Sequence, residues 1–206
     1  MILQPIVEGH GEVDAIPALL RRFVQESGLY EIRVARAIRS HRADLAREDS
    51  LQKVIEVARL GGAEGILITF DSDDDCPVDL AQQIGAWAKK HANPLACEVA
   101  IAEREYEAWF LGSIESLRGT RGIALDAVSE AAPEAVRGAK AKLEKKMLAG
   151  RFYSERADQI ALTVQLDLAQ SYRTCRSFRR IVNAFAQIST GAGLVLESWP
   201  PAQWVR

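Results

Sequence analysis

The sequence predicts an α/β fold: a mainly parallel sheet flanked by helices, with a helical C-terminal appendage. Short apolar runs bounded by glycine or proline alternate with helical patterns, and this alternation is typical of βαβ units. From about residue 119 the strand patterns stop, and the segments that follow are rich in Ala, Lys and Arg. We therefore expect an α/β core over residues 1–115 and a helical appendage over 116–206 that packs on it.

The first predicted βαβ unit begins with a strand over Ile2–Val7. Two glycines, Gly9 and Gly11, suit a tight turn into a helix, because glycine adopts positive φ without a steric penalty. Apolar residues at helical spacing predict that this helix runs from Glu12 to about Gln25. Apolar and basic residues then alternate over Glu31–Ile38, which predicts the second strand.

The next segments repeat the pattern. Ser40–Asp49 is polar and predicts a loop, and a helix follows over Ser50–Leu60. The run Ile66–Phe70 is short, apolar and rich in β-branched residues, as expected of a strand covered on both faces. A helix over Val78–His91 and a strand over Cys97–Ala102 complete the predicted core.

The predicted appendage contains no strand pattern. Residues 119–134 indicate a loop with a short helix, and Pro133–Leu148 indicates a basic helix. Two further helices are expected over Ala157–Gln170 and Ser171–Ile188. The end of the chain, Thr190–Arg206, contains two glycines and two prolines and is expected to be a loose tail.

Composition sets few limits on function. A chain of 206 residues that is 48% hydrophobic and 26% charged can bury one good core. Its net charge of −2 neither indicates nor excludes nucleic acid as a partner. The three cysteines match no zinc or redox spacing. No apolar run approaches the roughly 20 residues of a membrane span. We expect a cytoplasmic protein with no membrane partner.

A cluster of carboxylates follows the strand over Ile66–Phe70. Asp71 and Asp73 lie two residues apart, so in extended backbone their side chains point the same way. Glu8 follows the first strand, and the carboxyl ends of parallel strands share one rim of the sheet. Carboxylate oxygens suit a hard cation such as Mg²⁺ or Mn²⁺. The expected metal ligands are Glu8, Asp71, Asp73 and Asp75; the alternative is a solvated acidic turn.

Other residues extend this candidate site. Glu103, Glu105 and Glu107 follow the last predicted core strand, and Glu107 joins Glu8, Asp71 and Asp73 as a candidate catalytic residue. His10 is either a proton carrier beside the site or a turn histidine in water. Arg173, Arg176 and Arg180 share one helical face. These arginines and Lys140 are candidates for nucleic-acid binding, or else form a solvated basic face.

Three other acidic-loop interpretations fit less well. An EF-hand loop starting at Asp71 requires Gly where Cys76 stands and a bidentate Glu where Gln82 stands. A phosphatase with an aspartate nucleophile prefers Thr or Val where Asp75 stands. A nucleotide-sugar transferase with the same Asp-x-Asp pair leaves the Val-Glu-Gly of the first strand unexplained.

The pattern Val7-Glu8-Gly9 with Glu12, followed by Phe70-Asp-Ser-Asp73, resembles the TOPRIM signature. The added Glu105-Tyr-Glu-Ala-Trp-Phe-Leu111 resembles the DUF4276 family of uncharacterised bacterial proteins more narrowly. This resemblance implies a TOPRIM or Rossmann-like sheet and a Mg²⁺-dependent phosphodiester site, as in topoisomerases, primases and OLD-type nucleases. OLD-type sites also imply a later lysine, for which this chain offers Lys140 or Lys142.

Two functions follow from these observations. The first is a Mg²⁺-dependent nuclease or related phosphodiester-cleaving enzyme. The second is a non-catalytic partner that works with a separate ATPase in a bacterial defence or DNA-processing system. The chain contains no P-loop motif of its own, so any ATP dependence would come from such a partner. Metal binding at the acidic rim distinguishes the two hypotheses.

Overall fold

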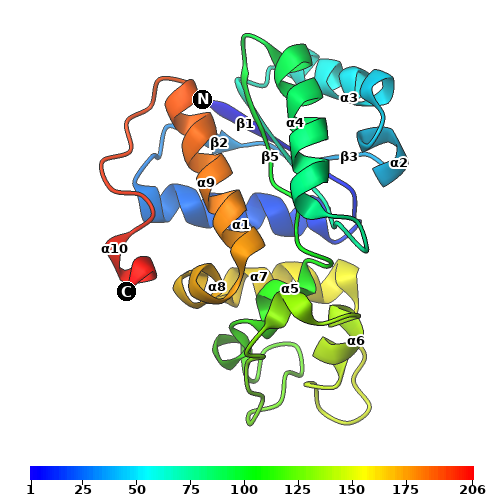
Figure 1. The fold of residues 1–206 in the computed structure, drawn as a ribbon. Helices are drawn as coiled ribbons and strands as arrows, with labels where there is room; N and C mark the ends of the chain where they lie inside the picture. The colour runs from blue at the N-terminus through cyan, green and yellow to red at the C-terminus, as the bar shows by residue number, and fades with distance from the viewer.

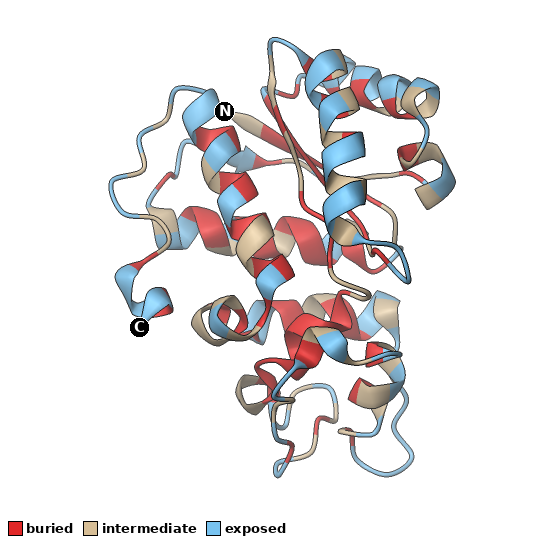
Figure 2. Ribbon diagram, viewed as in Figure 1, coloured by how far each residue is buried: buried red, intermediate tan, exposed pale blue.

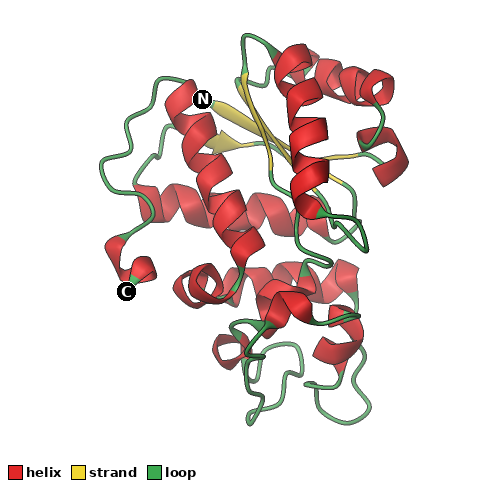
Figure 3. Cartoon of the chain, in the orientation of Figure 1, coloured by secondary structure: helices red, strands yellow, loops and turns green.

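A five-stranded sheet lies at the centre of the fold (Figures 1 and 3). The computed structural model describes residues 1–206. All pairings within the sheet are parallel, and the order is β2-β1-β4-β5, with β3 also beside β1. The strands are β1 (Ile2–Val7), β2 (Arg33–Val34), β3 (Ile38–Arg39), β4 (Gly65–Thr69) and β5 (Ala96–Val99). The predicted α/β class with a mainly parallel sheet is confirmed.

The register brings the ends of the two central strands to one rim. Val7 pairs with Thr69 at the end of β1 and β4, and Val7 also pairs with Arg39 at the end of β3. An isolated bridge between Asp71 and Ala102 extends the pairing beyond β5. The residues that follow these strands therefore leave the sheet side by side, as expected for parallel strands.

Helices cover both faces of the sheet (Figures 1 and 2). On one face, α3 (Glu48–Leu60) and α4 (Pro77–Ala92) share a core with Ile66 and Ile68 of β4. On the other face, α1 (Glu12–Ser27) and α9 (Arg176–Gly191) share a larger core with Leu67. Successive residues of a strand point to opposite faces, so one buried strand supplies both cores.

Helix α9 lies very close to the sheet. A Cβ at Gly65 would come within 2.6 Å of Cγ2 of Ile188, and one at Gly191 within 2.9 Å of Cβ of Ala96. Only glycine leaves room for this approach. The predicted appendage of residues 116–206 therefore supplies one helix of the layer that α1 and α9 form on the sheet.

The remaining elements form a lobe below the rim and a C-terminal strap (Figure 1). Trp199 and Trp204 of the strap pack against Phe23 of α1, with ring centroids 5.7 and 6.3 Å away. No helix is both long and apolar enough to cross a membrane. The helices of the lobe and the strap are α5 (Glu107–Leu111), α6 (Ala139–Glu144), a π-helix (Glu155–Gln159), α7 (Ile160–Gln165), α8 (Leu168–Thr174), α10 (Ala202–Val205) and short 3₁₀ turns at Ile114–Leu117 and Pro133–Ala135.

The predicted single strand over Glu31–Ile38 is wrong, because the segment forms β2 and β3 separately. Pro5 of β1 causes the interruption, since it has no N–H to donate on that side of the strand. The Gln4 side chain donates instead to the Pro5 carbonyl at 2.9 Å and to the Arg36 carbonyl at 2.7 Å. Pairing of β1 with its neighbour therefore stops at Leu3 and resumes at Ile6.

Two other local predictions are also wrong. The expected loop over Ser40–Asp49 contains α2 (Arg42–Leu45) and the start of α3. The expected basic helix over Pro133–Leu148 is reduced to a 3₁₀ turn and α6. Gly138, with φ of 65°, interrupts the helical backbone ahead of α6, and a left-handed residue cannot continue a right-handed helix.

Candidate functional site

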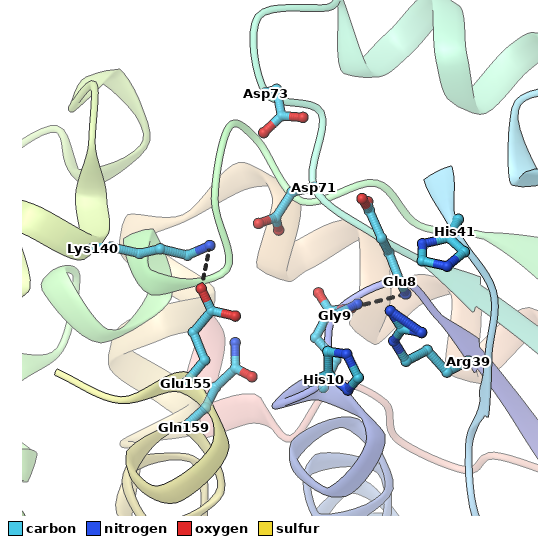
Figure 4. A pocket seen from close by; sticks show the side chains of 11 residues that line it. Glu8, Gly9, His10, Arg39, His41, Asp71, Asp73, Lys140, Glu155 and Gln159 are labelled. Atoms are coloured by element: carbon cyan, nitrogen blue, oxygen red, sulfur yellow. Dashed lines mark hydrogen bonds and ion pairs between the residues drawn. The ribbon is translucent and has the colours of Figure 1, made fainter. Parts of the chain in front are cut away.

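A polar pocket opens at the rim where β1, β3 and β4 end (Figure 4). Its volume is about 250 Å³, and none of its eleven lining residues is hydrophobic. Residues at or just after the ends of β1, β3 and β4 form one side of the pocket. Residues of α6 and the π-helix, in the lobe below, form the opposite side. The lining residues are Glu8, Gly9, His10, Glu12, Arg39, His41, Asp71, Asp73, Lys140, Glu155 and Gln159.

The turn from β1 into α1 is built around the buried carboxylate of Glu12. Its Oε2 accepts hydrogen bonds from the backbone N–H groups of Glu8, at 3.1 Å, and Gly9, at 2.8 Å. A Cβ at Gly9 would stand 3.3 Å from this carboxyl group, closer than most side chains tolerate. Burial raises the pKa of Glu12 from 4.5 to about 7, against the effect of the two hydrogen bonds.

Two further acids lie near Glu12: Asp71, which also lines the pocket, and Glu107, which lies behind it. Asp71 Oδ1 accepts a hydrogen bond from the Tyr106 N–H at 2.9 Å. Burial raises the pKa of Asp71 well above its usual value, and the charges of Glu12 and Glu107 raise it further. Glu107 is completely buried, and burial raises its pKa to about 7. Three carboxylates therefore share a site in which their negative charges repel one another.

Glu107 has one satisfied and one unsatisfied oxygen. Its Oε1 accepts hydrogen bonds from the Tyr153 hydroxyl at 2.8 Å and from Gln159 Nε2 at 3.4 Å. Its Oε2 is buried without a hydrogen-bond partner, as is the Oε1 of Gln159. Buried acceptors without a donor are costly. A bound cation or water is the ordinary way to satisfy them.

Glu8 and Asp73 lie nearer the mouth of the pocket. Glu8 is half-buried, and burial raises its pKa; Arg42 opposes this shift and Asp73 adds to it. Asp73 is exposed and has φ of 51°, a conformation that a non-glycine residue rarely adopts. The structure thus brings Glu8, Asp71 and Asp73 to one pocket.

Arg42 holds the acidic loop in place, and sequence reasoning missed it because it lies in the expected loop over Ser40–Asp49. Its guanidinium donates to the backbone carbonyls of Asp71 and Ser72 and to the carboxylates of Asp73 and Asp75. It also lies 5.6 Å from the centroid of the Phe70 ring. Asp75, a predicted metal ligand, is turned toward Arg42 and does not line the pocket.

The lobe contributes Lys140, which sequence reasoning proposed together with Lys142. Lys140 Nζ lies 2.8 Å from Glu155 Oε1 (Figure 4). Burial lowers the pKa of Lys140, but Glu107, Glu155 and Asp71 outweigh it, so the pKa lies above its usual value. Lys142 instead pairs with Glu130 at 3.3 Å and lies outside the pocket lining.

The π-helix closes this wall, and π-turns are frequent at functional sites. Its Asp158 accepts hydrogen bonds from the Ser154 N–H at 2.8 Å and from Arg121 Nε at 2.6 Å. A Cβ at Gly11 would lie 2.2 Å from Gln159 Oε1 and 2.5 Å from the backbone oxygen of Glu155, and because the backbone cannot move aside, only glycine lets the β1–α1 turn approach this helix. No sequence pattern indicated that Glu155 and Gln159 would meet that turn.

The predicted basic stripe lies apart from the pocket lining. Arg173 and Arg176 are exposed, and Arg173 Nη1 donates to the Gln203 carbonyl at 3.3 Å. Arg180 is half-buried, and its Nη1 has no hydrogen-bond partner. None of the three lines the pocket.

A hard cation fits the chemistry of these donors. The acids beneath and around the pocket supply carboxylate oxygens, which Mg²⁺ and Mn²⁺ prefer. Burial raises the pKa values of Asp71 and Glu107, and Glu107 Oε2 is buried without a hydrogen-bond partner. No group of three or more His, Cys, Asp or Glu side chains is already arranged around a common metal position.

The fold and the pocket define an α/β protein with an acid-rich polar site at the carboxyl edge of a parallel sheet. The chain belongs to the family described as "Domain of unknown function (DUF4276)", whose profile matches residues 7–186. The resemblance to this family is thereby confirmed. No curated protein and no solved structure matches the chain.

Proposed function

We propose that this protein is a Mg²⁺- or Mn²⁺-dependent enzyme that hydrolyses phosphodiester bonds in nucleic acid. The observation that carries the proposal is the meeting of Glu12 and Asp71, which line the polar pocket, with Glu107 behind them, all three with pKa values raised chiefly by burial. A protein retains such a cluster at a cost to stability, and perturbed acids in a pocket are typical of functional sites. The TOPRIM resemblance of Glu8, Asp71 and Asp73 is part of the same proposal.

The proposed roles follow from position. Asp71, Glu8 and Asp73 would hold the metal, which would lower the pKa of a bound water and polarise the phosphodiester. Glu107 and Glu12 supply negative charge behind Asp71. Glu8, with its raised pKa and partial exposure, would accept a proton. Lys140 keeps its charge and would offset the charge that develops on the phosphoryl oxygens.

Metal binding is tested through thermal stability. The protein is first treated with EDTA to remove any bound metal. Addition of Mg²⁺ or Mn²⁺ should then raise its melting temperature, because a ligand that binds only the folded state stabilises it by about 2.7 kcal/mol at 100 times its Kd. Asp71→Asn keeps an oxygen for the Tyr106 N–H but loses the charge, so the metal should no longer stabilise the protein. Asp79→Asn, on the exposed surface of α4, is the matched control.

Cleavage is tested with plasmid and labelled single strands of DNA and RNA in the presence of each metal. The wild type and Asp79→Asn should cleave, and Asp71→Asn should not. Asp71→Asn should bind nucleic acid at least as tightly as the wild type, because it removes negative charge beside a polyanion. If the wild type is neither stabilised by metal nor active, the nuclease proposal is wrong, and the non-catalytic partner hypothesis takes its place.

A further inference from the structure

The pocket has a basic side that the proposed hydrolysis does not use. Arg39, His10 and His41 line it opposite Lys140 and Glu155 (Figure 4). The pairing of Val7 with Arg39 fixes Arg39 at the end of β3, beside the strand that leads to Glu8. The backbone therefore positions this arginine at the rim of the sheet.

The side chains of this basic side have no partners in the protein. No carboxylate lies within ion-pair distance of Arg39, His10 or His41, although the other pocket cation, Lys140, is paired. The Nε of Arg39 is buried and has no hydrogen-bond partner. A buried donor without an acceptor is destabilising. An oxyanion supplied by a ligand would satisfy it.

We propose that Arg39, with His10 and His41, forms a binding site for a phosphate group of the substrate that is not itself hydrolysed. A guanidinium binds phosphate oxygens through two parallel hydrogen bonds, and neighbouring imidazoles add donors. The site rests on the proposed function for its substrate class, a nucleic acid strand whose adjacent phosphate lies at the acids. Its ability to bind phosphate does not depend on hydrolysis.

The lining of the pocket limits what such a site recognises. The lining contains no Phe, Tyr or Trp, so the pocket lacks the large aromatic rings on which bases commonly stack. A volume of about 250 Å³ suits phosphate and sugar groups. We therefore expect recognition of the backbone, without preference for base sequence.

The three histidines of the chain provide a direct test by NMR at fixed pH without divalent metal. Inorganic phosphate should shift the ring signals of His10 and His41 in a saturable manner. His91 is the internal control, because its Nε2 lies 2.9 Å from Glu48 and outside the pocket. Equal shifts for all three histidines, or no shift at His10 and His41, would overturn the proposal.

Substitutions identify the residue that binds. Arg39→Gln should weaken phosphate binding roughly tenfold or more, since it removes a charge-assisted hydrogen-bond donor. Arg36→Gln, an exposed arginine on the same segment, should leave binding unchanged. His10→Asn, at an exposed position, is a second variant that should weaken binding without loss of fold. Equal affinities for Arg39→Gln and Arg36→Gln would show that the site does not exist.

The source of the phosphate is resolved with oligonucleotides. Strands with and without a 5′-phosphate are compared for binding to the wild type and to Arg39→Gln. Tighter, Arg39-dependent binding of the phosphorylated strand supports a terminal phosphomonoester as the ligand. Equal but Arg39-dependent binding supports an internal phosphodiester. These measurements use no metal, so they stand even if the wild type cleaves nothing. Conversely, if Arg39→Gln cleaves nucleic acid with the same KM as the wild type, the phosphate site is refuted while the proposed hydrolysis stands.

Discussion

At the scale of single residues, the buried acids make the stability of the metal-free protein depend on pH. Glu12 and Glu107 have folded-state pKa values of about 7, above the ordinary 4.5. Between these values the folded state binds more protons than the unfolded state, so stability falls as pH rises. The stabilisation is fully present below pH 4.5 and is lost as pH passes through 7.

Urea unfolding in EDTA across this window should therefore show a decrease in the free energy of unfolding with rising pH. A shift of this size corresponds to on the order of 3 kcal/mol for one group. Glu107→Gln should flatten the dependence, and Glu26→Gln, an exposed residue of α1, should not. An identical pH profile for wild type and Glu107→Gln would contradict the environment described for Glu107.

Some residues of the site could be predicted from the sequence, and others could not. Glu8, Asp71 and Asp73 were predictable, because acids that follow strands of a parallel sheet share its rim. Arg39 and His41 lie at and after the end of β3, but the interruption at Pro5 hid where that strand ends. Spacing alone does not determine that Asp75 turns toward Arg42, because the direction of a loop side chain depends on partners distant in sequence.

At the scale of elements, the loop after β4 depends on one side chain from α2. Arg42 bonds two backbone carbonyls and two carboxylates of this loop. Arg42→Ala should therefore loosen the loop and weaken Mg²⁺ or Mn²⁺ binding about tenfold, measured by calorimetry. Arg42→Lys keeps the charge without the planar fork and should rescue only part of the affinity.

Arg47→Ala is the control for this prediction, since Arg47 lies just ahead of α3 and makes no ion pair with the loop. The melting temperature of each variant without metal separates a loosened loop from global unfolding. Metal affinity equal in Arg42→Ala and Arg47→Ala would show that the loop keeps its conformation without the clamp.

The approach of α9 to β4 predicts a second effect at this scale. Gly65→Ala should destabilise the protein by about 1–3 kcal/mol, because the new methyl group would overlap Ile188. Ile188→Ala removes that overlap, so the double variant should be less destabilised than the sum of the single variants. Gly85→Ala, in α4 with open space around it, should instead be stabilising. If the effects of the two substitutions on stability simply add, Gly65→Ala destabilises the protein for a reason other than overlap with Ile188.

At the scale of the whole molecule, the proposed function implies that nucleic acid longer than the pocket also contacts other parts of the surface, and the exposed Arg173 and Arg176 are the candidates on α8 and α9. Arg173→Glu with Arg176→Glu should weaken binding and reduce its salt dependence, by about 0.9 in the log–log slope for each phosphate that is no longer neutralised. Metal-induced stabilisation should remain. The double variant Arg47→Glu with Lys53→Glu changes the charge by the same amount elsewhere on the surface and is the control. If both double variants show the same salt slope, the stripe does not contact nucleic acid.

The α/β core was predictable as a whole, because buried parallel strands and the helices between them have distinct periodicities. The arrangement of the C-terminal half was not. Helical spacing indicated α9, but nothing in it showed that Gly65 and Gly191 would let this helix pack directly on the sheet beside α1. Tertiary contacts between distant segments, such as Gly11 with Gln159, leave no local pattern.

The contact between Gly11 and Gln159 also has a consequence during synthesis. The ribosome releases β1, β4 and their acids long before it has translated the π-helix that forms the opposite wall of the pocket. A nascent chain ending near residue 115 would contain the carboxylates but would lack Lys140, Glu155 and Gln159, and also α9 on the sheet. Any activity that depends on the closed pocket is thus withheld until nearly the whole chain has emerged.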